Sequence, residues 1–211
     1  MPLEDYLSAG DMNDLDRARL RRELGLEPQH VAVAMAARLE PRKGHTYLFQ
    51  AVERLQQEHP DLRVLILGDG VHRAELEAEV AARGLVSCVR FLGHRQDLAQ
   101  ILAAVDVSVL TSLWEGLPRV LVQSAAAGRP IVTFDVEGAW EVVREGENGF
   151  IVPSRDVDKL TARLDTVLRD RLRARAMGRV GRQQVTEAWT VETMLDRLDA
   201  MYTRNTKDRV A

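Results

Sequence analysis

One stretch of the chain combines a carboxylate, a turn and an amide at a spacing that suits a polar ligand. Glu115 follows an apolar run and precedes Gly116, Leu117 and Pro118, after which a helical pattern carries Gln123 in its second turn. Since proline fits the first helical position, we expect the helix to begin at Pro118. A carboxylate accepts hydrogen bonds from sugar hydroxyls, and an amide both donates and accepts them. The plainer alternatives are a favourable charge at a helix N-terminus for Glu115 and a solvent-facing amide for Gln123.

Two cations follow the first apolar run of the chain. Arg38 and Lys43 bracket Pro41 and Gly44 just before a helical pattern, an arrangement that favours a polyanion such as a diphosphate. Arginine can donate a forked pair of hydrogen bonds to two oxygens, and lysine adds a compact charge. On these two residues alone, a solvated basic loop is the better interpretation.

Two further turns carry weaker signals of a ligand site. Gly68 and Gly70 would let the backbone approach a ligand closely, but the third glycine and the distant acidic residue of a dinucleotide fingerprint are not there. His94 and Arg95 lie in the next turn, where a histidine is more often plain surface than a base. For this turn we expect backbone contacts to the edge of a ligand.

All of these residues follow predicted strands. Continuous apolar runs predict strands at 31–36, 62–70, 88–93, 106–112, 130–134 and 149–153. Amphipathic segments of roughly ten residues separate the strands, a pattern that predicts one α/β domain with a doubly wound, six-stranded parallel sheet. In such sheets ligands bind at the carboxyl ends of the strands. We therefore expect Arg38, Lys43, Glu115 and Gln123 to meet in one crevice.

The composition is that of an ordinary globular protein. Its 211 residues are 45% hydrophobic, 29% charged and only 5% aromatic, with a net charge of −3. This balance gives no general attraction to nucleic acid, and the low aromatic content argues against binding single strands by base stacking. The single Cys88 excludes an internal disulfide and a cysteine-rich zinc site, and we expect it to be buried. Without a long apolar run or a secretion signal, the expected location is cytoplasmic.

The expected boundaries follow from composition and periodicity. Residues 1–13 are polar and aperiodic, and we expect a linker or tail there. Asp14 or Asp16 can cap the first helix. One domain is predicted over residues 14–203, with two or three helices after Asp156 and a tail at 204–211.

Two charge patterns have both a functional and a structural interpretation. Seven arginines lie between residues 163 and 182, at 163, 169, 171, 173, 175, 179 and 182. They could form a patch for an anionic membrane or an acceptor lipid, but we favour a solvated helix face because they form no single clear stripe. The acidic triplets at 14–16 and 156–158 could suggest a metal site; because both precede helical patterns, capping explains them better.

Several segments taken together resemble a known family, the C-terminal domain of retaining GT-B glycosyltransferases of the large family-4-like group. The resemblance covers roughly residues 14–203, and only the combination of motifs is specific. It implies a Rossmann-like fold. The segments that carry it are ARLEPRKG, LGDG, FLGHRQDLAQILAAVDVSVLTSLWEGLPRVLVQSAAAGRPIV, EVVREGENGFIVP and AWTVETMLDRLDAMY.

The resemblance assigns roles to the carboxylate and the amide. The family carries two glutamates separated by seven residues; the first reaches the donor sugar and the second holds the nucleotide ribose. Glu115 matches the first, and Gln123 stands in place of the second. An amide lacks charge assistance, so this contact should be weaker by about 1 kcal/mol. Ala37 and Glu137 also replace usual glycines, and Glu137 would put an extra carboxylate near the donor cleft.

The same resemblance implies roles for the remaining turns. Arg38 and Lys43 would neutralise the departing nucleoside diphosphate in place of a metal, so no metal and no cofactor are expected. The base and phosphates would be bordered by the turn at Gly68–Gly70 and by the loop with His94 and Arg95. At the helix start, the diphosphate would lie against Gly116, Leu117 and Pro118.

For the whole protein, the resemblance implies transfer of a hexosyl group from a nucleotide sugar to an acceptor hydroxyl, with retention through front-face attack. UDP is the most usual nucleotide and GDP the next. The enzyme would need an N-terminal acceptor-binding domain, in the same chain or a separate one, so the chain is either a truncated piece or a natural half. Alone it would be inactive or very weak. Peripheral membrane contact would run through the N-terminal half.

The last predicted helix should cross back to the N-terminal domain, and it should expose apolar surface when that domain is absent. This helix carries Trp189, Met194, Leu195, Leu198 and Met201.

Two other functions stay open. One is a non-catalytic nucleotide-binding or scaffolding module, which Gln123 favours. The other is a related fold with different chemistry, such as a nucleotide-sugar epimerase or an NAD-dependent enzyme, although the incomplete glycine fingerprint argues against NAD.

Overall fold

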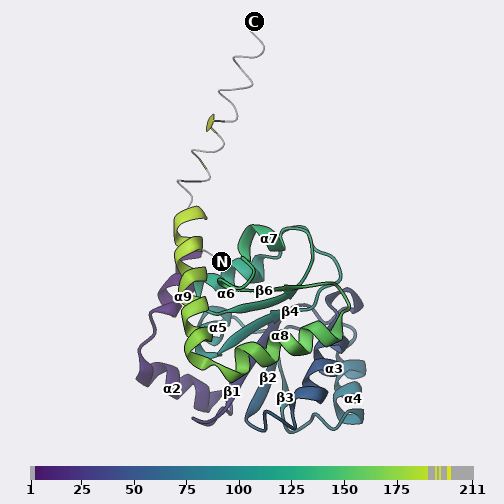
Figure 1. Ribbon diagram of the computed structural model, residues 1–211. Coiled ribbons are helices and arrows are strands. Elements are labelled where there is room, and N and C mark those ends of the chain that lie inside the picture. Colours follow the sequence, from purple (N-terminus) through teal and green to yellow (C-terminus); the bar gives the residue numbers. More distant parts are fainter. Residues whose placement is uncertain (1–2, 190–192, 194, 196–198, 201–211) are drawn as a thin grey trace, which may run out of the picture.

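The computed structural model describes residues 3–189, 193, 195, 199 and 200. Six parallel strands form one sheet in the order β3-β2-β1-β4-β5-β6 (Figure 1). The strands are β1 (Val31–Ala36), β2 (Leu62–Leu67), β3 (Val89–Gly93), β4 (Val107–Leu110), β5 (Ile131–Phe134) and β6 (Gly149–Val152). The predicted doubly wound α/β fold is thereby confirmed.

Helices cover both faces of the sheet because its strands are apolar on both sides. In β1, Val33 and Met35 point into one core and Ala32 and Ala34 into the other. The first face is covered by α3 (His45–Leu55), α4 (Arg73–Ala82) and α8 (Val157–Arg169). The second is covered by α1 (Leu3–Gly10), α2 (Asp14–Glu23), α5 (Leu98–Ala104), α6 (Arg119–Ala126) and α7 (Ala139–Val142). Figure 1 shows α8 lying across the first face.

The order of strands creates one opening at the carboxyl edge of the sheet. Strands β1 and β4 are parallel neighbours, paired through Val33 with Val107 and Ala34 with Ser108. The chain leaves β1 for α3 on the first face and leaves β4 for α6 on the second. Loops that diverge from adjacent strands leave a crevice between them, which is where open α/β sheets bind ligands.

The long helix α9 (Arg171–Ala188) passes from one face of the sheet to the other. Its residues Ala174 and Met177 belong to the first core, whereas Val185 belongs to the second. A Cβ on Gly178 would lie 2.0 Å from the carbonyl oxygen of Gly128, in the turn before β5, so only glycine permits this approach. Helix α9 therefore crosses the amino-terminal side of the sheet, opposite the crevice.

The structure corrects two expectations for the N-terminal segment. Residues 3–10 form α1, and its Tyr6 is only 1% exposed, packed in the second core with α5 and α6. A short helix that buries one large ring gives little periodic signal, which explains why the sequence suggested a linker or tail. The cap of α2 is Asn13, whose side chain accepts a hydrogen bond from the backbone N–H of Asp16, and neither Asp14 nor Asp16 takes that role.

The C-terminal part follows the expectation of further helices after Asp156, with α8 and α9 in place. Of the five apolar residues expected on a last helix, Trp189 packs against the second core and Leu195 is 52% exposed. The other three, Met194, Leu198 and Met201, lie outside the described residues. Over the part of the chain that is described, no helix has both the length and the apolar character needed to traverse a bilayer.

The burial of Tyr6 makes a prediction about stability. Tyr6→Ala should lower the free energy of unfolding by about 3 kcal/mol, because it removes a large side chain from a packed core and leaves a cavity. Ser8→Ala on the exposed side of α1 should change it by less than about 0.5 kcal/mol. Urea denaturation followed by circular dichroism measures both. Equal stability of the two variants would show that α1 is not part of the folded core.

Candidate functional site

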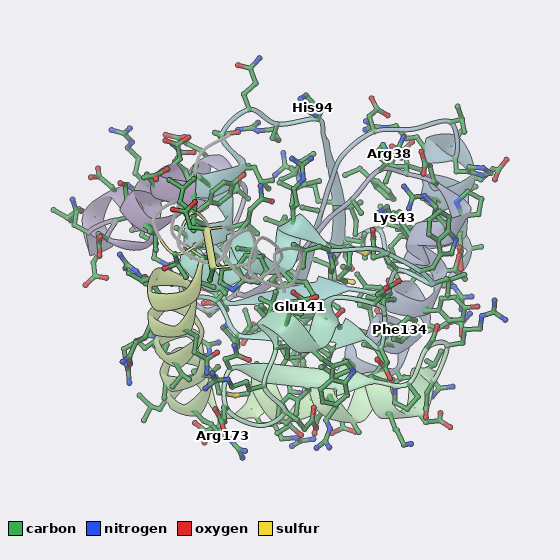
Figure 2. All side chains as sticks on the ribbon, turned by 90° about the horizontal axis from the view of Figure 1, so that it is seen from above. Arg38, Lys43, His94, Phe134, Glu141 and Arg173 are labelled. Atoms are coloured by element: carbon green, nitrogen blue, oxygen red, sulfur yellow. The ribbon has the colours of Figure 1, made fainter. Side chains whose placement is uncertain are left out.

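A cleft of about 650 Å³ opens at the carboxyl ends of β1, β2 and β4. Arg38, Lys43, Glu115 and Gln123 all line it, as expected from the sequence. Figure 2 shows Arg38, Lys43 and His94 on one side of the molecule, with Arg173 on the other. The full lining is Ala36, Ala37, Arg38, Lys43, Leu67, Gly68, Asp69, His94, Arg95, Leu98, Leu110, Glu115, Leu117, Pro118, Arg119, Val120 and Gln123.

The loop after β1 is fixed against the end of β4. It forms a short 3-10 turn, η1 (Pro41–Lys43), and then Gly44 adopts a left-handed conformation with φ 66°. A Cβ on Gly44 would lie 2.2 Å from the carbonyl oxygen of Thr111, while the hydroxyl of Thr111 donates to the carbonyl of Gly44 at 2.9 Å. The N–H of Leu113 adds a bond of 2.8 Å to the carbonyl of Arg42. These contacts bring the two cleft loops together.

An ion pair joins the two loops inside the cleft. The Lys43 Nζ donates to the Glu115 Oε1, and each side chain is only 12% exposed. A charge-assisted hydrogen bond in such a partly buried place is stronger than one on the open surface. Lysine has three N–H donors, so this bond leaves further donors for a ligand. The pair holds a cation and a carboxylate side by side.

Arg38 is held less firmly than Lys43. Its Nη1 lies 2.9 Å from Glu40 Oε1, and its side chain is 67% exposed. Glu40 also accepts a 2.9 Å bond from Arg42, and the bond to Arg42, with the charge of Arg38, lowers the pKa of the Glu40 carboxyl. The guanidinium of Arg42 in turn lies 4.7 Å from the centre of the Trp114 ring. Arg38 can therefore leave its partner for a ligand without disturbing a buried contact.

The glycines after β2 allow the loop that contains them to pack closely against the loop after β1. Gly68 lines the cleft, but with φ 130° its Cβ would lie 2.0 Å from the carbonyl oxygen of Ala37. A Cβ on Gly70 would lie 2.4 Å from the carbonyl oxygen of Leu39, and Gly70 is not part of the lining. Gly68 therefore borders the cleft as expected and Gly70 does not, and at both positions the loop after β1 requires the glycine.

The start of α6 differs by one residue from the prediction. Pro118 has ψ 93°, an extended value, so it is the N-cap residue and Arg119 begins the helix. Leu117 and Pro118 line the cleft and Gly116 does not. Arg119, which the sequence analysis missed, also lines the cleft, and within the described residues it has no hydrogen-bond or ion-pair partner. The position of Arg119 at the start of a helix that faces the crevice was the feature of the sequence that could have identified it.

The remaining turns contribute side chains of both charges. His94 and Arg95 line the cleft, and Arg95 donates a forked pair of bonds of 2.8 and 2.6 Å to Asp97. These bonds raise the pKa of Arg95 and lower that of Asp97. Asp69, also missed from the sequence, lines the cleft as well. Glu137 is exposed and does not line the cleft, but it precedes Gly138, whose added Cβ would lie 3.0 Å from the Cα of the cleft residue Leu117.

Two aspartates of the acidic triplet at 156–158 have contacts that give them structural roles. The side chain of Asp156 caps α8 by accepting a 2.9 Å bond from the N–H of Lys159. Asp158 pairs with Arg54. In the described part of the chain, no three histidine, cysteine or acidic side chains come together as a metal site would require.

Comparison with known proteins identifies the family. Residues 16–184 match the family model described as glycosyl transferases group 1, which covers most of the chain. The chain belongs to this family. Among its relatives is a GDP-mannose-dependent monoacylated alpha-(1-6)-phosphatidylinositol monomannoside mannosyltransferase of Corynebacterium glutamicum, 33% identical over 87% of this chain and 50% of that protein. Another is the lipopolysaccharide core biosynthesis glycosyltransferase LpsE of Rhizobium meliloti, 32% identical over 89% of this chain and 55% of that protein.

Solved structures agree that this group 1 glycosyltransferase domain has the GT-B C-terminal fold. Anabaena HepE in complex with UDP superposes with a TM-score of 0.86 and 25% identity, over 94% of this chain and 55% of HepE. The C-terminal domain of the group 1 protein LpcC from Francisella tularensis superposes with a TM-score of 0.75 at 22% identity, over 83% of this chain and 93% of that domain. The chain spans about half the length of the full relatives it matches.

The glycine contacts predict which substitutions the site tolerates. Gly68→Ala should lower the free energy of unfolding by more than about 2 kcal/mol, because the added Cβ meets backbone and the φ of 130° is strained for alanine. Gly116→Ala should change it by less than about 0.5 kcal/mol, since nothing lies within 4 Å of the added Cβ. Thermal unfolding of the two variants measures the contrast. Similar losses in both would contradict the packing described for the two loops.

Proposed function

We propose that this domain binds the nucleotide-sugar donor of a hexosyltransferase that retains anomeric configuration, with a UDP-sugar as the donor. The observation that carries the proposal is the Lys43–Glu115 pair, which sets a cation and a carboxylate together in the cleft with Arg38 and Gln123. A diphosphate needs cations and a sugar needs hydrogen-bond acceptors, so the two parts of a donor have partners here. Crystal structures of the relative HepE with UDP and with UDP-glucose support the choice of nucleotide.

The cations have a defined task in this proposal. Cleavage of the bond between sugar and diphosphate leaves negative charge on the departing phosphate oxygen, and fixed cations stabilise that charge where a metal would otherwise do so. Lys43 keeps its bond to Glu115 and turns its other N–H donors to the diphosphate. Arg38 exchanges Glu40 for a second phosphate oxygen. Neither step needs a metal ion, and no cofactor takes part.

The carboxylate and the amide orient the rest of the donor. Glu115 accepts hydrogen bonds from hydroxyls of the transferred sugar, and Gln123, one helical turn into α6, bonds the ribose. The turns with Gly68, His94 and Arg95 border the base and phosphates. The acceptor hydroxyl attacks from the side that the diphosphate leaves, which retains the configuration.

Transfer requires a second domain that binds the acceptor. The relatives that match are about twice as long as this chain, which supports an N-terminal acceptor domain supplied in the same chain or by another one. We infer that the C-terminal domain alone binds the donor but transfers sugar very weakly or not at all. A cytoplasmic location is part of this proposal. Donor binding without transfer, even after the N-terminal half is joined, would favour a non-catalytic nucleotide-binding module.

The proposal predicts that UDP stabilises the domain. At 100 times its dissociation constant, UDP should add about 2.7 kcal/mol and raise Tm by about 5–10 °C, with the same shift in EDTA. Lys43→Ala and Arg38→Ala should each remove most of the shift, measured against the Tm of the same variant without UDP. Lys159→Ala on α8, outside the cleft, is the control. GDP and ADP are tested in parallel. The proposal would be refuted if the Tm shift with UDP vanished in EDTA, or if it persisted in both Lys43→Ala and Arg38→Ala.

The amide at position 123 gives a second prediction. Gln123→Glu should tighten UDP binding about fivefold, because a carboxylate adds charge assistance worth about 1 kcal/mol to the bond with the ribose hydroxyls. Gln123→Ala should weaken binding. Isothermal titration calorimetry measures both, with the exposed Gln57→Glu as a matched control for the added charge. Unchanged affinity in both variants would place the ribose away from α6.

A further inference from the structure

A second cavity lies at the opposite end of the sheet from the donor cleft. It has a volume of about 350 Å³ and lies among α2, α9 and the residues that precede β1, β4 and β5. Seven arginines line it, with only two aspartates: Arg17, Arg21, Arg129, Arg171, Arg175, Arg179 and Arg182, with Asp14 and Asp106. We call this cavity the arginine pocket. The concentration of positive charge is unusual in a chain whose net charge is −3.

Helix α9 supplies four of the arginines from one side. Residues 171, 175, 179 and 182 follow the spacing of a helical face, and all four line the arginine pocket. Arg163 and Arg169 belong to α8, where they pair with Glu145 and Asp165. The four residues therefore do form a stripe on α9, contrary to the expectation, although Arg171, Arg175 and Arg179 are exposed to solvent, as a solvated helix face requires.

Carboxylates neutralise only part of this charge. Asp106 pairs with Arg17 at 2.9 Å and Arg21 at 3.1 Å and also accepts the N–H of Ala32. Burial alone would raise the pKa of Asp106, but the two arginines and the backbone bond lower it, so it stays ionised. Arg182 pairs with Asp11 at 2.7 Å.

Within the described residues, two other arginines of the pocket donate hydrogen bonds to carbonyl oxygens alone. Arg129 donates to the carbonyls of Ala127 and Val105 at 3.0 and 2.9 Å, and Arg171 donates to that of Gln29 at 2.8 Å. A carbonyl satisfies an N–H donor but does not cancel the charge. Burial, with the nearby charge of Arg17 and other arginines, lowers the pKa of Arg129 to about 10.

Two arginines of the pocket have neither a carboxylate nor a carbonyl partner among the described residues. Arg175 and Arg179 are exposed on α9 at the pocket and, over the part of the chain that is described, make no hydrogen bond or ion pair. Their guanidinium groups are therefore available to a ligand from solvent. They face a cavity that also holds Arg129 and Arg171, neither of which forms an ion pair with another described residue, although the nearby charge of Asp106 partly offsets that of Arg129.

We propose that the arginine pocket binds a phosphate-bearing anion, with Arg175 and Arg179 as the residues that capture it. A phosphate group presents several acceptor oxygens to the forked donors of arginine and carries close to two negative charges, so it compensates several guanidinium groups at once. The cavity admits a group the size of a diphosphate. The phosphate belongs either to a soluble molecule or to a lipid headgroup, and the two sources share this chemistry. The site is separate from the donor cleft, because the length of the sheet lies between them.

The test uses inorganic pyrophosphate as the probe and thermal unfolding as the readout, in the Lys43→Ala background so that binding in the donor cleft is weakened. Pyrophosphate at ten times its dissociation constant should raise Tm by about 3–6 °C above sodium chloride of equal ionic strength. Arg175→Gln with Arg179→Gln should abolish this rise, with circular dichroism to confirm folding. Arg173→Gln, which removes the same charge from the same helix outside the pocket, should keep it.

A vesicle arm distinguishes the two sources of phosphate. Co-sedimentation with phosphatidylglycerol vesicles but not phosphatidylcholine vesicles, lost in the double variant and kept in Arg173→Gln, would support a lipid headgroup. A Tm rise with pyrophosphate without co-sedimentation would support a soluble ligand. The proposal is overturned if neither probe binds, or if the double variant responds to the probes as strongly as Arg173→Gln does.

Discussion

The site depends on one feature of the sheet, the parallel pairing of β1 with β4. Because the chain leaves these neighbours towards opposite faces, the loops after them diverge and leave a crevice at the carboxyl edge. Gly44 and Thr111 then draw the base of the two loops into contact, which places Lys43 against Glu115. The chemistry of the cleft therefore follows from topology, and residues 72 positions apart become one charged pair.

The two ends of the sheet differ in how far carboxylates compensate the positive charge there. At the carboxyl end, three of the cations that line the cleft, Lys43, Arg38 and Arg95, already have carboxylate partners in Glu115, Glu40 and Asp97, which a ligand can share or displace. At the amino end, α9 brings a row of arginines beside Arg129, and carboxylates compensate only some of them. Glycine at position 178 makes this possible by letting α9 approach the turn before β5. The same helix thereby joins both cores and forms the wall of the arginine pocket.

Much of the fold could be predicted because its signals are local and periodic. The strand at 31–36 was predicted with its bounds, and the meeting of Arg38, Lys43, Glu115 and Gln123 followed from the rule that parallel strands end together. Contacts that depend on three-dimensional packing could not be predicted. Tyr6 is buried by helices far along the chain, and the neighbour of Gly70 is a backbone carbonyl of another loop. The row of four arginines on α9 was hidden among three others of the same type, two of them on α8.

A crystal structure of this domain with UDP-glucose would test the central claim most directly. The account predicts the diphosphate within hydrogen-bonding distance of Lys43 and Arg38, with hydroxyls of the glucose on Glu115 and the ribose on Gln123. It would be contradicted by a nucleotide bound elsewhere, or by a diphosphate in the cleft that contacts neither cation.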